Sequence, residues 1–391
     1  MTATRTDQSQ RSDTPNFIPE IDGLRAFAIL GVLLFHLQLP WCSLGWAGVE
    51  LFFVISGFLI TRILLASRDK PRYFTTFYSR RTLRIFPIYY LVITVYTLVM
   101  LFSHGWGAVR TMPFYYAYLQ TIPQLRSGLT DAPMLIHTWT LAIEEQFYLL
   151  WPLVVLLLTG RKFLIANVAI LLVAPIIRFL MLSASNPYLM NGWLPVQMDL
   201  LGAGAIIAFA SQYLSVRAFQ RGAMVALAAG AAALVIIVKH AGLEAFWTVP
   251  QWSRLWYSPL LPSALAAVFA GIVALAGSRH ALTRWLSWRP LTHYGKISYG
   301  IYLYHPYAFE AMDHLFDKYK AAHPHMHHAW SMPIVLKLGC SYAVALVSWH
   351  LIESPMKRLK ERLTRWLRAT PPKVVDLPIF REPDKGLELT G

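Results

Sequence analysis

Charge and cysteine are both scarce in this sequence. Asp, Glu, Lys and Arg make up only 14% of the 391 residues, whereas soluble domains carry about 25%. The two cysteines, Cys42 and Cys340, give neither a disulfide framework nor a metal-ligand spacing. Residues 1–17 are polar and contain no apolar core. We therefore expect no cleavable signal peptide and expect the first spanning helix to direct membrane insertion.

Apolar residues dominate instead, at 56% of the chain with a mean hydropathy of +0.45. Apolar stretches of about 17 to 25 residues recur, which is the length that spans a bilayer, whereas a closed barrel would show short alternating segments. We expect an all-α, polytopic transmembrane bundle. Its about ten spans are predicted at residues 22–40, 46–67, 85–102, 139–158, 163–182, 196–213, 223–239, 256–277, 296–316 and 331–352.

Basic residues concentrate in alternate loops, around residues 68–84, 161–162, 217–221 and 279–289. This pattern places those loops, and both termini, on the cytoplasmic side. It also accounts for the net charge of +15, so we expect no nucleic-acid partner. The predicted organisation is a polar cytoplasmic N-terminus (1–17), a transmembrane domain (18–355), and a basic amphipathic segment with a disordered cytoplasmic tail (356–391).

Three further segments are harder to assign. Residues 356–368 and 73–84 each mix basic with apolar or aromatic side chains and are predicted to lie at the inner membrane surface. Residues 106–138 are too broken for a span and could form an external loop or a partly re-entrant one. A short external run holds His323, His325, His327 and His328, for which a solvated loop is favoured over a metal site.

The first span carries charge on one face. Asp22 and Arg25 lie at its start and His36 near its far end, and the spacing between Arg25 and His36 is about three helical turns. Charge inside a membrane helix is expensive and usually has a function. His36 is predicted in the outer half of the membrane, where its imidazole could act as a general base or be a histidine bonded within the bundle.

The fourth span contains two adjacent carboxylates, Glu144 and Glu145. Their predicted depth matches that of His36, so a contact in which a carboxylate orients the imidazole is feasible. The alternative is an ion pair with Arg178. We favour the functional interpretation.

Other candidates are distributed along the chain. Arg81 and Arg84 share a helical face at the inner surface, which suits phosphate recognition, although for these residues taken alone a topology signal with anionic lipid contact is the favoured explanation. The remaining candidates are intramembrane polar groups, each of which could be catalytic or structural: Tyr302 and His305 before Pro306, Glu353, Glu50 and Asp199. Ser56 and Gly57 are predicted to serve close helix packing, with Ser56 not a nucleophile.

Six segments, in order, make the chain resemble the acyltransferase family 3 of membrane-spanning acyltransferases. They are residues 21–36, 48–60, 80–87, 139–152, 297–306 and 353–355. In this resemblance His36 matches the essential histidine, Arg25 its partner arginine, Arg81 and Arg84 the paired-arginine motif, and Glu145, ahead of Glu144, the acid of the fourth span.

The resemblance implies transfer of an acyl group, commonly acetyl from acetyl-CoA, to a hydroxyl of a cell-surface glycan such as lipopolysaccharide O-antigen, exopolysaccharide or peptidoglycan. Some relatives carry a fused extracytoplasmic esterase-like domain. We expect none here, so that transfer finishes in the membrane domain or on a separate protein. The implied location is the bacterial inner membrane, and polysaccharide assembly proteins are candidate partners.

The expected mechanism needs no metal. Arg81, Arg84 and Arg25 would bind the phosphates of cytoplasmic acyl-CoA, and His36 would deprotonate the glycan hydroxyl while Glu145 orients it. Tyr302 could stabilise the oxyanion, and an acyl-histidine intermediate stays open. Two alternatives from other classes are a multi-pass transporter for a glycan precursor and a non-catalytic subunit of an assembly complex.

Overall fold

The computed structural model describes residues 17–123, 132–182, 192–242, 259–323 and 331–369. The predicted N-terminal segment apart from its last residue, the tail from residue 370, and three of the four external histidines (His325, His327 and His328) lie outside this part. Every regular element in the described ranges is a helix, which confirms the all-α prediction.

One long helix overlaps each predicted span. The ten are α1 (Pro19–His36), α2 (Ala47–Ser67), α3 (Tyr73–His104), α6 (Trp139–Leu157), α7 (Gly160–Leu180), α8 (Leu194–Tyr213), α9 (Val216–Ala241), α10 (Leu261–Gly277), α12 (Ser298–Ala322) and α13 (Ser331–Ser348). Shorter elements connect them: η1 (Pro40–Trp46), η7 (Ala281–Ser287), α11 (Arg289–Lys296), the π-helical η8 (Trp349–Glu353) and α14 (Ser354–Ala369).

Seven of the described helical stretches are long and apolar enough to cross a membrane, or eight when α10 and η7, bent by 77°, count as one span. The difference from ten has a physical origin. Helix α1 holds Glu20, Asp22 and Arg25, and the outer half of α12 is also charged. The chain is a multi-pass membrane protein, while the number ten and the cytoplasmic termini stay predictions.

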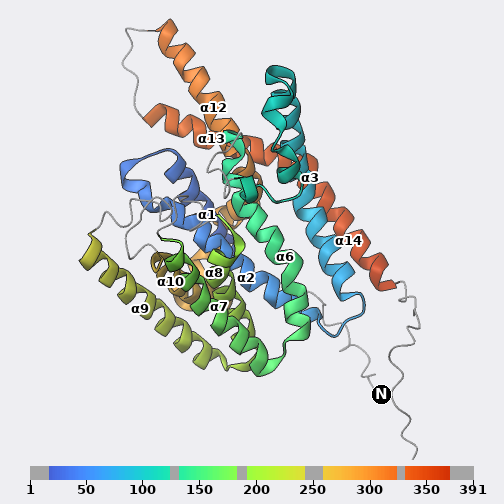
Figure 1. Ribbon diagram of the computed structural model, residues 1–391, viewed down its shortest axis with the longest axis vertical. Helices are drawn as coiled ribbons and strands as arrows, with labels where there is room; N and C mark the ends of the chain where they lie inside the picture. Colours follow the sequence, from blue (N-terminus) through green and yellow to red (C-terminus); the bar gives the residue numbers. More distant parts are fainter. Residues whose placement is uncertain (1–16, 124–131, 183–191, 243–258, 324–330, 370–391) are drawn as a thin grey trace, which may run out of the picture.

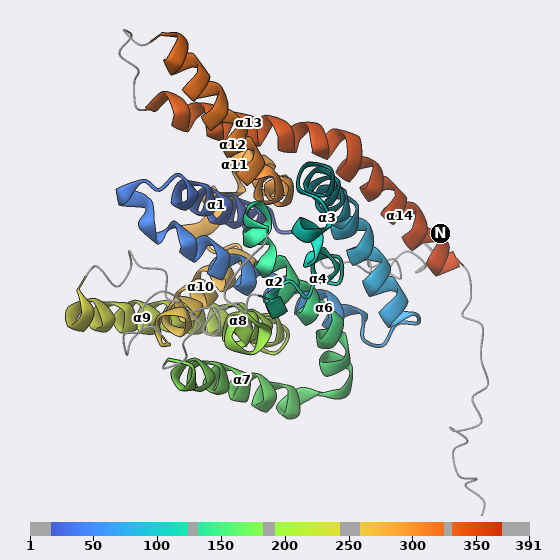
Figure 2. The same cartoon turned by 45° about the horizontal axis from the view of Figure 1, so that its top comes forward.

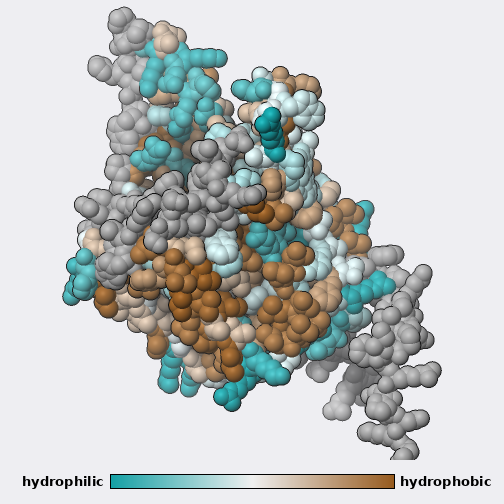
Figure 3. All heavy atoms as spheres, in the orientation of Figure 1, coloured by the Kyte–Doolittle hydropathy of each residue, from teal (hydrophilic) through white to brown (hydrophobic). Residues whose placement is uncertain are grey.

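Helices α1 and α2 lie between two groups of helices, as Figures 1 and 2 show from two directions. On one side α2 packs on α8, which in turn packs on α7 and α10, while α9 packs on α10. On the other side α1 packs on α11, α12 on α13, and α14 on α3. Hydrophobic side chains gather over the face nearest the viewer in Figure 3, and large exposed ones such as Leu172 on α7 and Val225 on α9 are suited to lipid.

Helices α2 and α8 approach closely enough for their backbones to touch. A Cβ added to Gly57 would overlap the carbonyl oxygen of Leu201, and one added to Gly204 would overlap that of Val54. Small residues permit such contacts in membrane helices, where packing replaces the hydrophobic effect as the driving force. The prediction that Gly57 serves close packing is confirmed.

The segment from 106 to 138 folds onto α3 in its described parts. It contains η2 (Trp106–Val109), α4 (Met112–Tyr116) and η3 (Pro133–Thr138). The Tyr118 ring stacks on Tyr89 of α3 at 4.2 Å, and the Tyr89 hydroxyl donates to the Tyr115 carbonyl at 2.8 Å. Buried Gln120 donates from Nε2 to the Thr138 carbonyl at 2.7 Å. Of the two predicted alternatives, these contacts favour a segment that re-enters the bundle.

Both predicted surface segments are continuous with longer helices. Residues 73–84 form the first turns of α3, and 356–368 belong to the helical stretch that runs on from α13 through η8 into α14. Basic residues change the composition of a helix without ending it, and the location of both segments at the inner membrane surface stays a prediction. The continuity holds α14 against α3.

The α2–α8 contact generates a stability prediction. Gly57→Ala forces two backbones apart, so we expect a loss of about 1–3 kcal/mol in the free energy of unfolding, as for overpacked cores. The measurement is thermal unfolding of the purified protein in detergent. Gly222→Ala on α9 is the control, since no atom lies within 4 Å of the added Cβ. Equal melting temperatures for the two variants would contradict the close contact.

Candidate functional site

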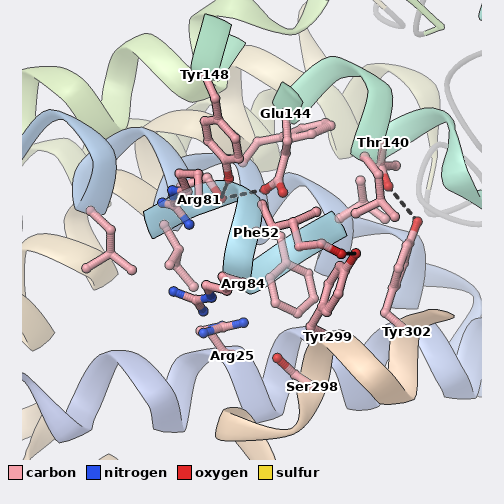
Figure 4. Close-up of a pocket in the computed structure, with 17 residues that line it drawn as sticks. Arg25, Phe52, Arg81, Arg84, Thr140, Glu144, Tyr148, Ser298, Tyr299 and Tyr302 are labelled. Carbon is pink, nitrogen blue, oxygen red and sulfur yellow. Dashed lines mark hydrogen bonds between the residues drawn. The ribbon is translucent and has the colours of Figure 1, made fainter. Parts of the chain in front are cut away.

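A pocket with a cavity volume of about 80 Å³, partly open to solvent, lies between α1, α2, α3, α6 and α12. Figure 4 shows that three arginines gather at one end, while the rest of the lining combines Glu144 and hydroxyl-bearing side chains with apolar ones such as Phe52. Six of the predicted site residues, from separate parts of the sequence, either line this pocket or adjoin it. They are Asp22, Arg25, Arg81, Arg84, Glu144 and Tyr302.

The arginine end combines two elements. Arg81 and Arg84 stand three residues apart on α3 and both line the pocket, as the predicted shared face requires, while Arg25 enters from α1. The Arg81 guanidinium lies 4.5 Å above the Tyr148 ring centre, and Arg84 is exposed to solvent. Arginine forks are planar and always charged, so three of them in one pocket have the chemistry suited to phosphate groups.

Carboxylates surround the arginines. Asp22 lies 3.9 Å from Arg25, and Glu144 is within electrostatic range of Arg25 and Arg81. Glu353 interacts electrostatically with Arg84 and Arg25 from the end of the π-helical turn, a distortion that often marks functional sites. Its Oε1 is buried and has no hydrogen-bond partner among the described residues.

The pocket wall contains a hydrogen-bonded chain that the sequence did not reveal. Ser56 donates from Oγ to Oε1 of Glu144 at 2.5 Å, and the Tyr148 hydroxyl donates to the same Oγ at 3.3 Å. Ser56 was predicted only as a packing residue, and its polar role was missed because its partners lie on α6, about ninety positions along the chain. These two hydrogen bonds hold Glu144 at the pocket surface.

Tyr302 closes the opposite end of the pocket. Its hydroxyl donates to the His137 carbonyl at 2.6 Å and lies 2.7 Å from Oγ1 of Thr140. Because its proton is held by this carbonyl, the hydroxyl is not free to stabilise an oxyanion in this conformation. Tyr302 instead separates the pocket from the histidines behind it.

Three histidines from three elements meet beyond Tyr302. The ring centres of His36 and His305 are 4.8 Å apart, and those of His137 and His305 are 5.2 Å apart. His305 is fully buried, whereas His36, the last residue of α1, is exposed. The sequence predicted His36 and His305 separately. It missed His137, which lies in the segment that could not be assigned.

His36 does not contact Glu145, contrary to the prediction. Nδ1 of His36 is 2.8 Å from the Val32 carbonyl of its own helix, and its ring neighbour on α12 is His305. Glu145 lies within electrostatic range of Arg81, Tyr118 and Tyr299. The predicted depths compared only positions along two helix axes, which say nothing about the direction in which each side chain points.

Arg178 is not the partner of Glu144 or Glu145 either. It is fully buried and forms a two-pronged ion pair with Asp199, in which Nη1 and Nη2 lie 3.0 and 2.5 Å from the carboxylate oxygens. Nη2 also donates to Oγ of Ser263, and Nε to the Pro259 carbonyl. Asp199 is therefore a structural partner, with Glu50 buried in electrostatic range of the pair.

Within the parts of the chain that the structure describes, no group of three or more His, Cys, Asp or Glu side chains is arranged to hold a metal ion. The histidine cluster is included in that statement.

Comparison with known proteins gives one family and several relatives. A family model described as an acyltransferase domain matches residues 18–351. The peptidoglycan O-acetyltransferase OatA of Listeria monocytogenes is 28% identical over 366 residues, which cover 88% of this chain and 56% of that protein. The O-acetyltransferase OatA of Staphylococcus aureus is 29% identical over 319 residues, 75% of this chain and 50% of that one.

YrhL of Bacillus subtilis is 30% identical over 364 residues, 87% of this chain and 55% of that protein. The chain therefore spans about half the length of the curated relatives it matches. No solved structure matches it.

The buried ion pair yields a prediction that separates structure from chemistry. Arg178→Leu leaves the Asp199 carboxylate buried without its partner, and such losses cost about 3–5 kcal/mol. We expect poor yield and a lowered melting temperature in detergent. The double variant Arg178→Leu with Asp199→Leu removes both charges and should recover most of the stability. A double variant that melts no higher than the single one would contradict the pairing.

Proposed function

The chain belongs to the acyltransferase family 3 of membrane proteins, and from this premise we propose that it transfers an acyl group, in the first instance acetyl, from cytoplasmic acyl-CoA to a hydroxyl of an extracytoplasmic glycan. The single observation that carries the proposal is the pocket that leads from three arginines to the tyrosine backing onto His36 and His305. The family match and the relatives named O-acetyltransferases support O-acyltransferase chemistry for this chain.

Donor binding is assigned to the arginine end. Acyl-CoA is a polar, phosphorylated molecule that does not cross a bilayer unaided. Arg84 is exposed at the mouth and Arg25 and Arg81 lie deeper, so the phosphates would be held where the pocket opens. Asp22 and Glu353 would hold the guanidinium groups of Arg25 and Arg84 in place, and the acyl-bearing arm would extend toward Tyr302.

His36 is assigned the role of general base. A carbonyl oxygen can only accept, so the contact with Val32 places the ring proton on Nδ1 and leaves the Nε2 lone pair available. Nε2 would take the proton of the acceptor hydroxyl as its oxygen attacks the thioester carbonyl. The new oxygen–acyl bond forms, the carbon–sulfur bond breaks, and the proton passes to the thiolate. If the reaction instead passes through an acyl-histidine intermediate, the same atom, Nε2 of His36, would carry the acyl group.

Glu145 and Glu144 are assigned to the donor side of the site. Glu144 is fixed by Ser56 and faces the arginines, while Glu145 lies close to Arg81. They would balance the arginine charge when no phosphate is bound. Tyr302, whose movement would open the route from the pocket to His36, acts as a barrier and not as an oxyanion donor.

The acceptor is a cell-surface glycan. The exposure of His36 at the end of α1 gives a hydroxyl access from the far side of the membrane. Since relatives are named peptidoglycan O-acetyltransferases, peptidoglycan is the first acceptor to test, ahead of O-antigen or exopolysaccharide. We also propose that both termini are cytoplasmic and that the protein lies in the bacterial inner membrane.

The deciding experiment measures turnover by the purified protein in liposomes. Acetyl-CoA is supplied on the side of Arg84 and peptidoglycan fragments on the opposite side, and release of free CoA is followed. His36→Ala should abolish release that depends on the fragments while leaving the amount of folded protein unchanged. His240→Ala is the matched control, because this exposed histidine makes the same bond to its own helix, at 2.9 Å. Full activity of His36→Ala would refute the assignment, and transport without CoA release would favour the transporter alternative.

Donor binding predicts a second kinetic effect. Arg84→Gln removes one charge-assisted contact, which is worth about 1.5–3 kcal/mol, so KM for acetyl-CoA should rise at least about tenfold with a smaller change in kcat. Arg62→Gln removes a positive charge elsewhere, outside this pocket, and should leave KM unaltered. An equal KM for both variants would exclude the arginine end as the donor site.

A further inference from the structure

His305 has a fixed tautomer, and the cause lies in the residue that follows it. In an α-helix the N–H of residue 306 would donate to the carbonyl of residue 302, but Pro306 has no N–H. The Tyr302 carbonyl is instead 2.7 Å from Nδ1 of His305. Since a carbonyl only accepts, Nδ1 carries the proton and Nε2 carries a lone pair.

Nε2 of His305 is a buried acceptor that nothing satisfies. The side chain is fully buried, and Nε2 has no hydrogen-bond partner among the described residues. Leaving such a group unpaired costs about 1–3 kcal/mol. A cost of this kind is recovered when a donor arrives at the site during function.

By ring-centre distance the nearer of the two neighbouring histidines is His36, at 4.8 Å against 5.2 Å for His137, and His36 becomes a donor at Nε2 only after it has gained a proton. The two rings lie 4.8 Å apart with their planes inclined by 57°. In both rings the Nδ1 atom faces a backbone carbonyl, of Val32 for His36 and of Tyr302 for His305. While both are neutral, each offers a lone pair at Nε2 and neither can donate to the other. A proton on Nε2 of His36 converts that atom into a donor.

We propose that His305 is the positioning partner of His36, accepting a hydrogen bond from the His36 imidazolium during transfer. This inference rests on the proposed function. As the acceptor oxygen bonds to the acyl carbon, its proton moves to Nε2 of His36, and the new N–H donates to Nε2 of His305. When the carbon–sulfur bond breaks, the thiolate takes that proton and both rings return to neutral.

The arrangement replaces the carboxylate expected beside His36. A carboxylate there would place a permanent charge in the membrane region, which is costly in every state of the cycle. A neutral imidazole with a free lone pair stabilises the proton only while it is present. His305 also occupies the required place, because its ring is 5.8 Å from Tyr302 at the pocket end and in contact with exposed His36 on the other side.

Two substitutions distinguish this role from simple packing. The amide nitrogen of His305→Asn can keep the bond to the Tyr302 carbonyl but has nothing at the position of Nε2. The longer side chain of His305→Gln places an amide oxygen near that position. A residue that only packs would tolerate Asn at least as well as Gln, whereas a partner for His36 needs the acceptor that Gln restores.

The experiment uses the full chain in liposomes with acetyl-CoA and peptidoglycan fragments as probes. We expect His305→Asn to lower kcat about 100-fold, within the range for general-base catalysis, with KM for acetyl-CoA within about twofold of wild type. His305→Gln should recover at least about tenfold of that loss in kcat. His240→Asn serves as the surface control, and melting temperatures of all variants are measured alongside.

A wild-type kcat for His305→Asn, or equal losses for Asn and Gln, would overturn the positioning role. If His36→Ala is inactive and His305→Asn is fully active, the proposed function stands and only this inference fails. If the wild-type protein releases no CoA although a known O-acetyltransferase does so in the same assay, the proposed function fails, and the role of His305 fails with it.

Discussion

Every polar group inside this bundle needs a partner within the protein, because neither lipid nor packed side chains provide one. The Arg178 network meets this requirement in full. All five N–H groups of the guanidinium find acceptors, from the Asp199 carboxylate, Ser263 and the carbonyls of Val196 and Pro259. This network connects α7 and α8 to the residues around the start of α10. It keeps that half of the molecule together without offering any group to a ligand.

Among the described residues, buried polar atoms without a hydrogen-bond partner occur on both sides of the bundle, for example Oδ1 of Asn167 on α7, and a second set lies near the pocket. Oε1 of Glu145, Oε1 of Glu353 and Nε2 of His305 are buried without hydrogen-bond partners among the described residues. All three belong to the region between the arginine pocket and His36. The same physical rule thus separates two kinds of buried polar group in one chain. Satisfied groups hold helices together, and the unsatisfied ones near the pocket are placed where a donor, an acceptor or a proton would complete them.

The positions of the helices could be predicted from sequence because they depend on local composition. Each predicted span overlaps one long helix, and the close approach at Gly57 follows from its lack of a side chain. Pairings across the bundle could not be predicted in the same way. Ser56 and Glu144 are 88 positions apart. The similar depths that suggested a contact between His36 and Glu145 did not determine the direction in which either side chain points. His137 was missed because η3, which holds it, takes its position by packing against α6 and α12, which follow it in the chain.

Pro306 links the local and the global requirements. A proline in a membrane helix frees one carbonyl, and that carbonyl must find another donor. Here the preceding histidine supplies it, so the helix is repaired by a side chain from the adjacent position. The repair uses one nitrogen of the ring, and the ring itself packs beside that of His36. A break in the helical hydrogen-bond ladder, usually regarded as a cost, therefore sets the tautomer of a buried neutral imidazole. The dipeptide His305-Pro306 acts as one structural unit, and its effect on the histidine tautomer can be inferred from the sequence only when both residues are considered together.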